Sequence, residues 1–249
     1  MRSISILMYH SLDSSGSAIS IVPQVFEAQM TRLAELGYHG VSLRQALADR
    51  EAKGDWPDKS VVLTFDDGYA SVHEHALPVL RRCKFSATVF VIPGHVDGVN
   101  DWGPPVAGFG RQEMLSWDQV KDLAENGIEI GAHTLSHADL TSLAGDALER
   151  EIAGSAEEIS LQLGEPVQTF AYPYGSLNNE AAAIVDRTFQ AVCTTVHRRA
   201  SNEPLTLLPR VEMYYFRNVR DLLPLVSGQL DRRLTLRRWA RRIRRLLPV

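Results

Sequence analysis

The amino-acid sequence predicts an α/β fold, a distorted (β/α) barrel of seven to eight mostly parallel strands in a single domain. Two observations support this prediction. Short apolar runs typical of buried strands alternate with amphipathic segments along nearly the whole chain. The length of 249 residues, with 45% apolar and 22% charged residues, suits a globular chain with a sizeable core. An open doubly wound sheet is the alternative that the same alternation allows.

Each expected element follows from its local pattern. The apolar runs predict strands at 4–9, 38–41, 60–65, 86–92, 128–132, 167–172, 189–195 and 207–214. The amphipathic segments predict helices over 24–36, 43–50, 69–82, 117–126, 145–163 and 178–187. Ser116 with Gln119 resembles a capping box, and Gly37, Gly127 and Gly164 stand where helix ends favour a left-handed residue.

The stretch 93–113 is rich in Gly and Pro and is expected to be a long irregular loop. It carries Trp102 and Phe109, which a purely solvated loop does not need. We therefore expect a loop that faces a substrate, although a disordered loop is the alternative. Cys83 and Cys193 lack the spacing of a metal site, and we expect both to be buried free thiols.

The charge is distributed unevenly between a body, residues 1–228, and a tail, residues 229–249. Residues 232–249 hold eight arginines and no acid, so the remaining 231 residues carry 18 basic against 30 acidic groups. An acidic body argues against nucleic-acid binding. The first residues lack the pattern of an export signal, and a cytoplasmic location is the expectation.

The tail has the pattern of a basic amphipathic helix. Its apolar residues recur at helical spacing, with arginines between them: Leu236, Trp239, Ile243 and Leu246. Such a helix could lie on an anionic membrane surface, so peripheral membrane association is one expectation. Packing of the same apolar stripe on the acidic body or on a second copy of the chain is the other, and both stay open.

Two adjacent carboxylates, Asp66 and Asp67, follow the strand 60–65 within Thr-Phe-Asp-Asp-Gly. Burying one charge is already costly, so a functional pair is favoured over a simple strand-ending turn. His133 and His137 follow the strand 128–132, and a helical turn there would put both on one face, able to bind one metal ion. Alone, the histidine pair is a weak signal.

The position of these residues in the alternation strengthens the prediction. In a (β/α) barrel the catalytic groups gather where the strands end. His10 ends the first strand, and Pro173-Tyr174-Gly175 follows the strand 167–172, so four strands deliver polar or turn-forming groups to one rim. One carboxylate and two imidazoles leave open positions on a divalent ion such as zinc. The second carboxylate could take a proton from water, which fits acyl-group hydrolysis.

With these motifs assembled, the chain resembles the polysaccharide deacetylase family, which shares the NodB-homology domain of the nodulation-factor deacetylase. The Thr-Phe-Asp-Asp-Gly and His-Thr-Leu-Ser-His blocks look like its first two motifs, and Phe170 to Gly175 looks like its third. The resemblance implies that Asp66 is the general base. It implies a metal site made of Asp67, His133 and His137. It also implies that Pro173 and Tyr174 contact the substrate, with the Tyr174 N–H facing the developing oxyanion.

Two departures from the family pattern need substitutes. The third motif usually carries an arginine that orients the base, where this chain has Ala171. Arg210 is our candidate to take its place beside the substrate, and an unrelated surface arginine is the alternative. The usual C-terminal histidine motif is missing. Met8-Tyr9-His10 resembles the opening of the circularly permuted subgroup that deacetylates poly-N-acetylglucosamine, which implies that His10 is the general acid. His39, His95 and His197 have no partner pattern and are expected at the surface or in loops.

The sequence thus predicts a metal-dependent deacetylase acting on an N-acetylated amino sugar, in a polysaccharide or a lipid-linked precursor. Trp102 suits sugar stacking and is expected to bind the substrate. Two other functions stay open: a related C–N hydrolase, such as a sugar deformylase, and a catalytically silent sugar-binding protein. The complete set of Asp66, Asp67, His133 and His137 argues against the silent protein.

Overall fold

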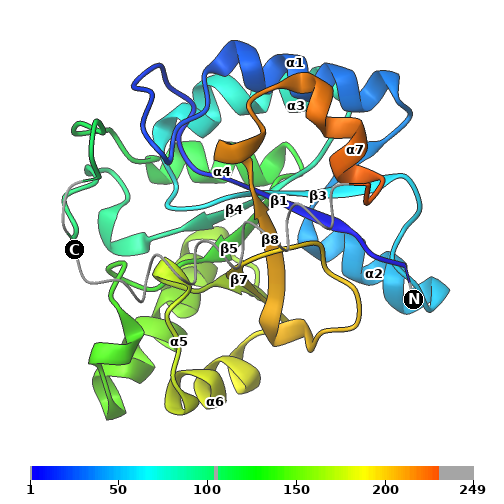
Figure 1. The fold of residues 1–249 in the computed structure, drawn as a ribbon. Helices are drawn as coiled ribbons and strands as arrows, with labels where there is room; N and C mark the ends of the chain where they lie inside the picture. Colours follow the sequence, from blue (N-terminus) through cyan, green and yellow to red (C-terminus); the bar gives the residue numbers. More distant parts are fainter. Residues whose placement is uncertain (1, 104–105, 230–249) are drawn as a thin grey trace, which may run out of the picture.

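The structure is a computed structural model that describes residues 2–103 and 106–229. Eight parallel strands form its centre, with helices packed above and below them in Figure 1. The strands are β1 (Ser5–Tyr9), β2 (His39–Val41), β3 (Ser60–Phe65), β4 (Thr88–Val91), β5 (Glu129–Ala132), β6 (Thr169–Ala171), β7 (Ala191–His197) and β8 (Leu208–Glu212). The helices are α1 (Pro23–Glu35), α2 (Leu43–Lys53), α3 (Leu77–Cys83), α4 (Trp117–Glu125), α5 (Gly145–Leu163), α6 (Asn179–Thr188) and α7 (Leu222–Val226).

The sheet closes into a barrel because β1 pairs with both β3 and β8. Tyr9 is in register with Phe65 on one side, and Met8 is in register with Glu212 on the other. On its other edge, β3 pairs with β2 through its first half and with β4 through its second half. The barrel therefore has seven strands, and β2 is an extra strand beside it. The barrel prediction is confirmed, and the open doubly wound sheet is wrong.

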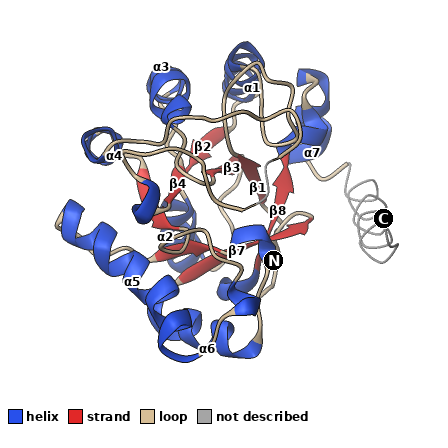
Figure 2. Ribbon diagram, turned by 90° about the vertical axis from the view of Figure 1, so that its left-hand side faces the viewer, coloured by secondary structure: helices blue, strands red, loops and turns tan. Residues whose placement is uncertain are grey.

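Side chains alternate between the inside and the outside of the barrel, as the period of a strand requires. On β3, Val61, Leu63 and Phe65 belong to the large apolar cluster under the outer helices, whereas Val62 belongs to a second cluster with Phe90 and Cys193. Figure 2 shows the helices ringed around the strands. Helix α2 joins the second cluster through Leu43 and Ala46, and its Leu43 N–H donates to Thr88 Oγ1.

Glycine is required at one point of the barrel wall. Gly131 on β5 lies against the Phe90 ring, and a Cβ at this position would come within 2.6 Å of a ring carbon and 2.8 Å of Thr169 Oγ1. Because such contacts are far inside van der Waals distance, any side chain at position 131 would displace the Phe90 ring. The lack of a side chain at position 131 thus leaves the space that the Phe90 ring occupies.

The boundary signals of the sequence are confirmed. Ser116 and Gln119 form a capping box at the start of α4, and Gly37, Gly127 and Gly164 have φ values of 74°, 79° and 71°. The expected helix 69–82 differs in its first turn, where Val72–Ala76 is a π-helix that continues into α3. The loop 93–113 is partly ordered by antiparallel bridges from Val99 to Glu113 and from Tyr69 to Met114.

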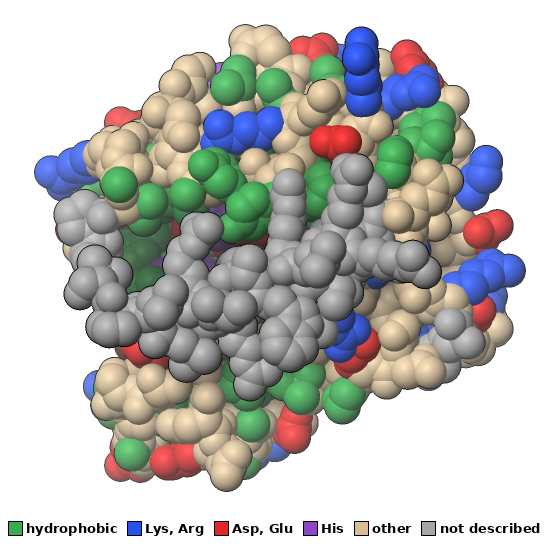
Figure 3. Space-filling view, viewed as in Figure 1, with side chains coloured by type: hydrophobic (Ala, Val, Ile, Leu, Met, Phe, Trp, Pro, Cys, Tyr) green, Lys and Arg blue, Asp and Glu red, His purple; other side chains and the backbone are tan. Residues whose placement is uncertain are grey.

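Outside the barrel, the surface carries charges of both signs. On the face in Figure 3, Lys and Arg side chains are interspersed with Asp and Glu over the residues that the structure describes.

Both cysteines are free; Cys193 is buried and Cys83 half-buried. Within the described ranges no helix combines the length and the apolarity that a membrane span needs. The predicted basic helix of the tail lies outside the described residues.

Candidate active site

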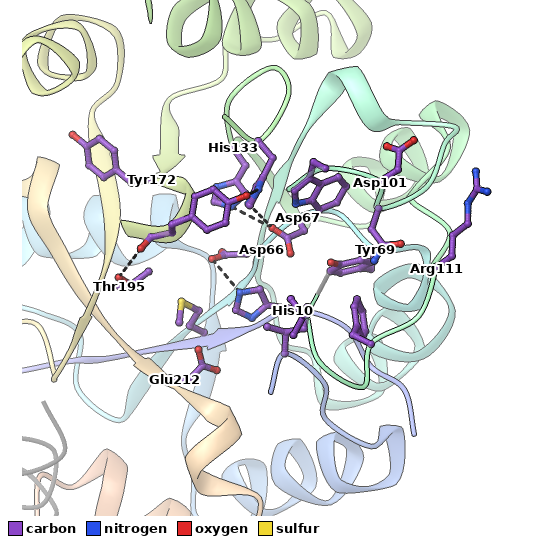
Figure 4. Close-up of a pocket in the computed structure, with 18 of the residues that line it drawn as sticks. His10, Asp66, Asp67, Tyr69, Asp101, Arg111, His133, Tyr172, Thr195 and Glu212 are labelled. Atoms are coloured by element: carbon purple, nitrogen blue, oxygen red, sulfur yellow. Dashed lines mark hydrogen bonds and ion pairs between the residues drawn. The ribbon is translucent and has the colours of Figure 1, made fainter. Parts of the chain in front are cut away.

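A cavity of about 740 Å³ opens at the carboxyl ends of the barrel strands. The predicted residues that line it come from the ends of β1, β3, β5 and β6 and from the loop after β4: His10, Asp66, Asp67, Trp102, His133, His137 and Tyr174. In Figure 4, His10, Asp66, Asp67 and His133 converge on this space. Its size falls in the range of pockets that hold a small molecule or part of a polymer.

The alternation within the strands explains why these side chains face inward. Asp66 continues the inward series of Val62 and Thr64 on β3, and His133 continues that of Glu129 and Gly131 on β5. Because parallel strands end at the same rim, the residue after each strand is delivered to the same opening.

Several site residues adopt left-handed backbone conformations. Asp67, His137 and Tyr174 have φ values of 73°, 60° and 57°, in a region that residues other than glycine rarely occupy. Such conformations cost on the order of 1–3 kcal/mol each and persist only where the surroundings impose them. Their clustering at one rim marks this end of the barrel as a site shaped for function.

Asp67, His133 and His137 form a compact group of three buried residues that could hold a metal ion. Nε2 of His133 and Nε2 of His137 each lie 3.3 Å from Asp67 Oδ1, and the three potential ligand atoms all lie within 4.8 Å of one another. Burial alone would raise the pKa of Asp67, but the two adjacent imidazoles hold it well below the usual value. Burial lowers the pKa of His137, which favours the neutral imidazole that a metal ion needs.

The hydrogen bonds of His133 show that these residues suit a cation. Nδ1 of His133 lies 2.7 Å from the Ala171 carbonyl oxygen, which can only accept, so Nδ1 carries the hydrogen. A neutral His133 then turns the lone pair of Nε2 toward the Asp67 carboxylate. Two electron pairs facing each other at 3.3 Å repel unless a positive charge lies between them. A divalent ion bound by two nitrogens and one oxygen fits this arrangement.

Asp66 is bound by a buried arginine from the last strand. Arg210 Nη1 and Nη2 donate to the two carboxylate oxygens of Asp66 at 2.6 and 2.7 Å, and its Nε donates to the Thr194 carbonyl. Burial raises the pKa of Asp66, but the Arg210 guanidinium outweighs this effect, and the net pKa lies below its ordinary value. Asp66 is thus held ionised although it is only 2% exposed.

Arg210 was expected both to contact the substrate and to orient Asp66, and the structure agrees only with the second role. It has no exposed surface and does not line the cavity, so the expected contact between Arg210 and the substrate is wrong. Its bidentate bond to Asp66 nevertheless supplies the orientation of the carboxylate for which it was the candidate. Ala171 on β6 points into the same interior cluster as Phe90, over whose ring the guanidinium lies at 5.7 Å.

His10 directly follows β1, the strand that lies between β3 and β8. Its Nε2 is 3.9 Å from Asp66 Oδ2, and 15% of its side chain is exposed to the cavity. An imidazole with this access can exchange a proton with a bound molecule, whereas a fully buried strand residue cannot.

The histidine pair is brought together by a turn that differs from the one expected. The segment from His133 to His137 is not helical; Thr134 and His137 are left-handed, and the expected helical turn is wrong. Glu151 of α5 braces the turn by accepting hydrogen bonds from the backbone N–H of Leu135 and Ser136 and from the Ser136 hydroxyl. Sequence analysis missed this role of Glu151, because only the packing of α5 places it beside the turn.

The residues expected to contact a substrate fall into two groups. Trp102 and Tyr174 line the cavity, and Tyr174 is 45% exposed. The Trp102 ring packs 5.1 Å from the ring of His137, so the loop 93–113 reaches the group formed by Asp67, His133 and His137. Pro173 is buried and does not line the cavity, so a direct contact with a substrate is not supported for it.

Further lining residues were not anticipated: Tyr69, Asn100, Asp101, Arg111, Thr195 and Glu212. Glu212 could have been found, since it lies two residues after Arg210 on β8 and so shares its inward face.

The position of His197 also differs from expectation. It is only 2% exposed, and its Nδ1 accepts the Glu212 N–H, so its expected place at the surface or in a loop is wrong.

Comparisons with known proteins agree with this geometry. Residues 53–190 match the sequence profile of the family described as polysaccharide deacetylase. YxkH of Bacillus subtilis, assigned by its name to the polysaccharide deacetylases, is 30% identical over 80% of this chain and 66% of its own length. The poly-beta-1,6-N-acetyl-D-glucosamine N-deacetylase of Staphylococcus aureus is 28% identical over 68% of this chain. This chain spans only 58% of that enzyme's length.

Solved structures show the same fold. The Streptococcus pyogenes deacetylase PplD in complex with acetate superimposes with a TM-score of 0.78 and 25% identity, covering 90% of this chain and 98% of that one. IcaB from Ammonifex degensii superimposes with a TM-score of 0.70 and 27% identity, over 91% and 97% of the two chains.

Proposed function

This chain belongs to the polysaccharide deacetylase family, and we propose that it uses a divalent metal ion, most simply zinc, to remove N-linked acetyl groups from an N-acetylated amino sugar. One observation carries the proposal: a three-ligand group, Asp67, His133 and His137, lies beside a second carboxylate, Asp66, that is held ionised at the same cavity. Three ligands leave room on the ion for a reacting molecule, as in catalytic sites, whereas a structural zinc site is closed by four.

The reaction adds water across an amide bond. When bound, the ion supplies Lewis-acid chemistry, which polarises the acetyl carbonyl and makes water a better nucleophile. Asp66 accepts the proton of the attacking water, whose oxygen forms the new bond to the acetyl carbon. The bidentate bond from Arg210 fixes the orientation of Asp66 and leaves further lone pairs on both oxygens free to accept that proton.

Breaking the carbon–nitrogen bond requires a proton on the leaving amine. His10 is exposed to the cavity 3.9 Å from Asp66, and in its protonated form it can donate to the nitrogen. The backbone N–H of Tyr174, held at a left-handed position of the rim, can donate to the oxygen on which negative charge develops. The products are acetate and a free amino sugar.

The shape and lining of the cavity support a carbohydrate substrate. Trp102 and Tyr174 offer aromatic rings at its wall, and rings of this kind stack on the apolar faces of sugars. The relative from S. aureus is named for a β-1,6-linked polymer of N-acetylglucosamine, which makes oligomers of that sugar the first substrate to test. Membrane association through residues 229–249 and a cytoplasmic location stay predictions of the sequence.

The experiment is to measure acetate release from N-acetylated sugars that differ in linkage, with β-1,6-linked and β-1,4-linked N-acetylglucosamine oligomers as the first pair. Formate release from N-formylated analogues tests the deformylase alternative. We expect chelation to abolish acetate release and zinc to restore it, because the ion polarises the acetyl carbonyl that water attacks. Release that persists after complete metal removal would refute the metal-dependent mechanism.

Two variants separate the roles of the adjacent carboxylates. Asp66→Asn should abolish acetate release while the protein still binds one zinc ion, because Asp66 is not among the three grouped ligands. Asp67→Asn should lose both the ion and the activity. An active Asp66→Asn enzyme would contradict the assignment of Asp66 as the base.

A further inference from the structure

We propose that the Tyr174 hydroxyl is a positioning group for the metal ligand His137, a role separate from the substrate contact of the same residue. The inference rests on the proposed function in one respect, the binding of a divalent ion by Asp67, His133 and His137. It assigns to the side chain of Tyr174 an effect on the affinity for the ion, whereas the backbone N–H of the same residue acts on the substrate.

The contact between the two side chains is direct. Tyr174 Oη lies 3.0 Å from Nδ1 of His137, and the two rings meet edge to face with centroids 4.6 Å apart. On the other side of the imidazole, Nε2 is the atom that faces Asp67 Oδ1, at 3.3 Å. A hydrogen on Nδ1, donated to the tyrosine oxygen, leaves the Nε2 lone pair free for an ion on the Asp67 side.

His133 shows the same principle with a different partner. Its Nδ1 donates to the backbone carbonyl of Ala171, an acceptor that a side-chain substitution at position 171 would not remove. The corresponding partner of His137 is a side-chain hydroxyl, which can be removed without altering the backbone. A backbone carbonyl therefore orients His133 and a side-chain hydroxyl orients His137. Of the two contacts, only the one to His137 can be removed by a side-chain substitution.

The loop 93–113 approaches the Tyr174 hydroxyl closely. The loop from Asn100 to Gly103 covers this side of the site, and a Cβ at Gly103 would come within 2.9 Å of Tyr174 Oη. The Trp102 ring lies 5.1 Å from His137, so Trp102 and Tyr174 pack against different parts of the same imidazole. Because Gly103 has a φ of 62°, glycine serves there both for the backbone conformation and for the space beside the hydroxyl.

Removal of the hydroxyl should weaken metal binding. His137 is only 8% exposed, so little water is available to replace a lost acceptor for its Nδ1 hydrogen. Loss of an outer hydrogen-bond partner of a metal-bound histidine typically lowers metal affinity about 10–100-fold. We expect Tyr174→Phe to raise the zinc dissociation constant by about this factor.

Tyr172 provides a matched control two residues earlier in the chain. Its hydroxyl is buried and has no hydrogen-bond partner among the described residues. Although Tyr172 also borders the cavity, its ring packs on Phe170, and Figure 4 shows its hydroxyl pointing away from Asp67 and His133. Tyr172→Phe removes the same atom from the same residue type. It should leave the zinc dissociation constant at the wild-type value.

The test measures zinc dissociation constants by competition with a chromophoric chelator, for the wild-type protein, Tyr174→Phe and Tyr172→Phe. The melting temperature of each metal-free protein is recorded in parallel. Weaker zinc binding in Tyr174→Phe alone, at an unchanged metal-free melting temperature, supports the inference. An equal dissociation constant in wild type and Tyr174→Phe overturns it and leaves the proposed function intact. A wild-type protein that binds no zinc overturns both.

A second measurement needs no variant. Side-chain ¹⁵N spectra of the zinc-loaded wild-type protein report which nitrogen of each histidine carries a hydrogen. We expect the hydrogen on Nδ1 in both His133 and His137. A His137 that carries its hydrogen on Nε2 would refute the positioning role of Tyr174, even if Tyr174→Phe failed to fold.

Discussion

Replacement of Arg210 by methionine should destabilise the protein strongly and in a way that depends on pH. Methionine keeps the unbranched apolar stem of the side chain but removes the guanidinium that donates to both oxygens of Asp66. Since Arg210 is fully buried and Asp66 is 2% exposed, the carboxylate would be left charged in the interior without a partner. Breaking a buried ion pair in this way costs about 3–5 kcal/mol of folding free energy.

The sign of the pH dependence follows from the pKa of Asp66. In the wild type this pKa lies below the ordinary value, so the pair contributes stability above the unfolded pKa of about 3.9. This contribution is lost as the pH falls through the folded pKa. In Arg210→Met burial raises the pKa of Asp66 against only the weaker attraction of His133 and His10, so the carboxylate can take up a proton and lose its unpaired charge at a higher pH. The difference in stability should therefore be largest at neutral pH and shrink on acidification.

Urea unfolding of the metal-free proteins at several pH values measures this difference. For a domain of this size the neutral-pH effect corresponds to a fall in melting temperature of about 6–20 °C. In the background Asp66→Asn the same Arg210→Met change should cost less, since no charge is left unpaired. A cost below about 1 kcal/mol at neutral pH, or one that does not change with pH, would refute the reasoning.

Two further predictions concern residues that line the cavity. His10→Ala should lower kcat about 10²–10⁴-fold if His10 protonates the leaving amine, with zinc affinity unchanged; an unaltered kcat in acetate-release kinetics would leave His10 a structural residue at the end of β1. Trp102→Ala should raise KM about 2–10-fold by removing a ring for sugar stacking, whereas Trp102→Phe should recover most of the loss. Equal KM values for Trp102→Ala and the wild type would argue against stacking.

The sequence predicted most of the fold because the relevant signals are local. Apolar runs, a capping box at Ser116 and glycines at helix ends each depend on a few neighbouring residues. The convergence of Asp66, His133 and His10 could also be predicted, because parallel strands end at one rim whatever the details of the barrel.

The partners of the buried charges could not be predicted in the same way. The inward face of β8 follows from its alternation, but the carboxylate that Arg210 meets depends on how far the strands are staggered around the barrel. A register irregularity between β7 and β8, from Cys193 to His197, contributes to that stagger and leaves no mark in the sequence pattern. The left-handed turn at His137, braced by Glu151, likewise depends on the packing of α5.

The pair formed by Asp66 and Arg210 also bears on how the chain folds. The two residues are separated by 144 positions, and the strands that carry them, β3 and β8, flank β1, which closes the barrel. A nascent chain that has emerged only as far as α6 lacks Arg210, the group that does most to keep Asp66 ionised in a closed interior, so early burial of β3 is disfavoured. Contacts of such long sequence separation form late and slowly. The barrel should therefore close in the same step in which Arg210 pairs with Asp66, and this step can occur only after β8 has been synthesised.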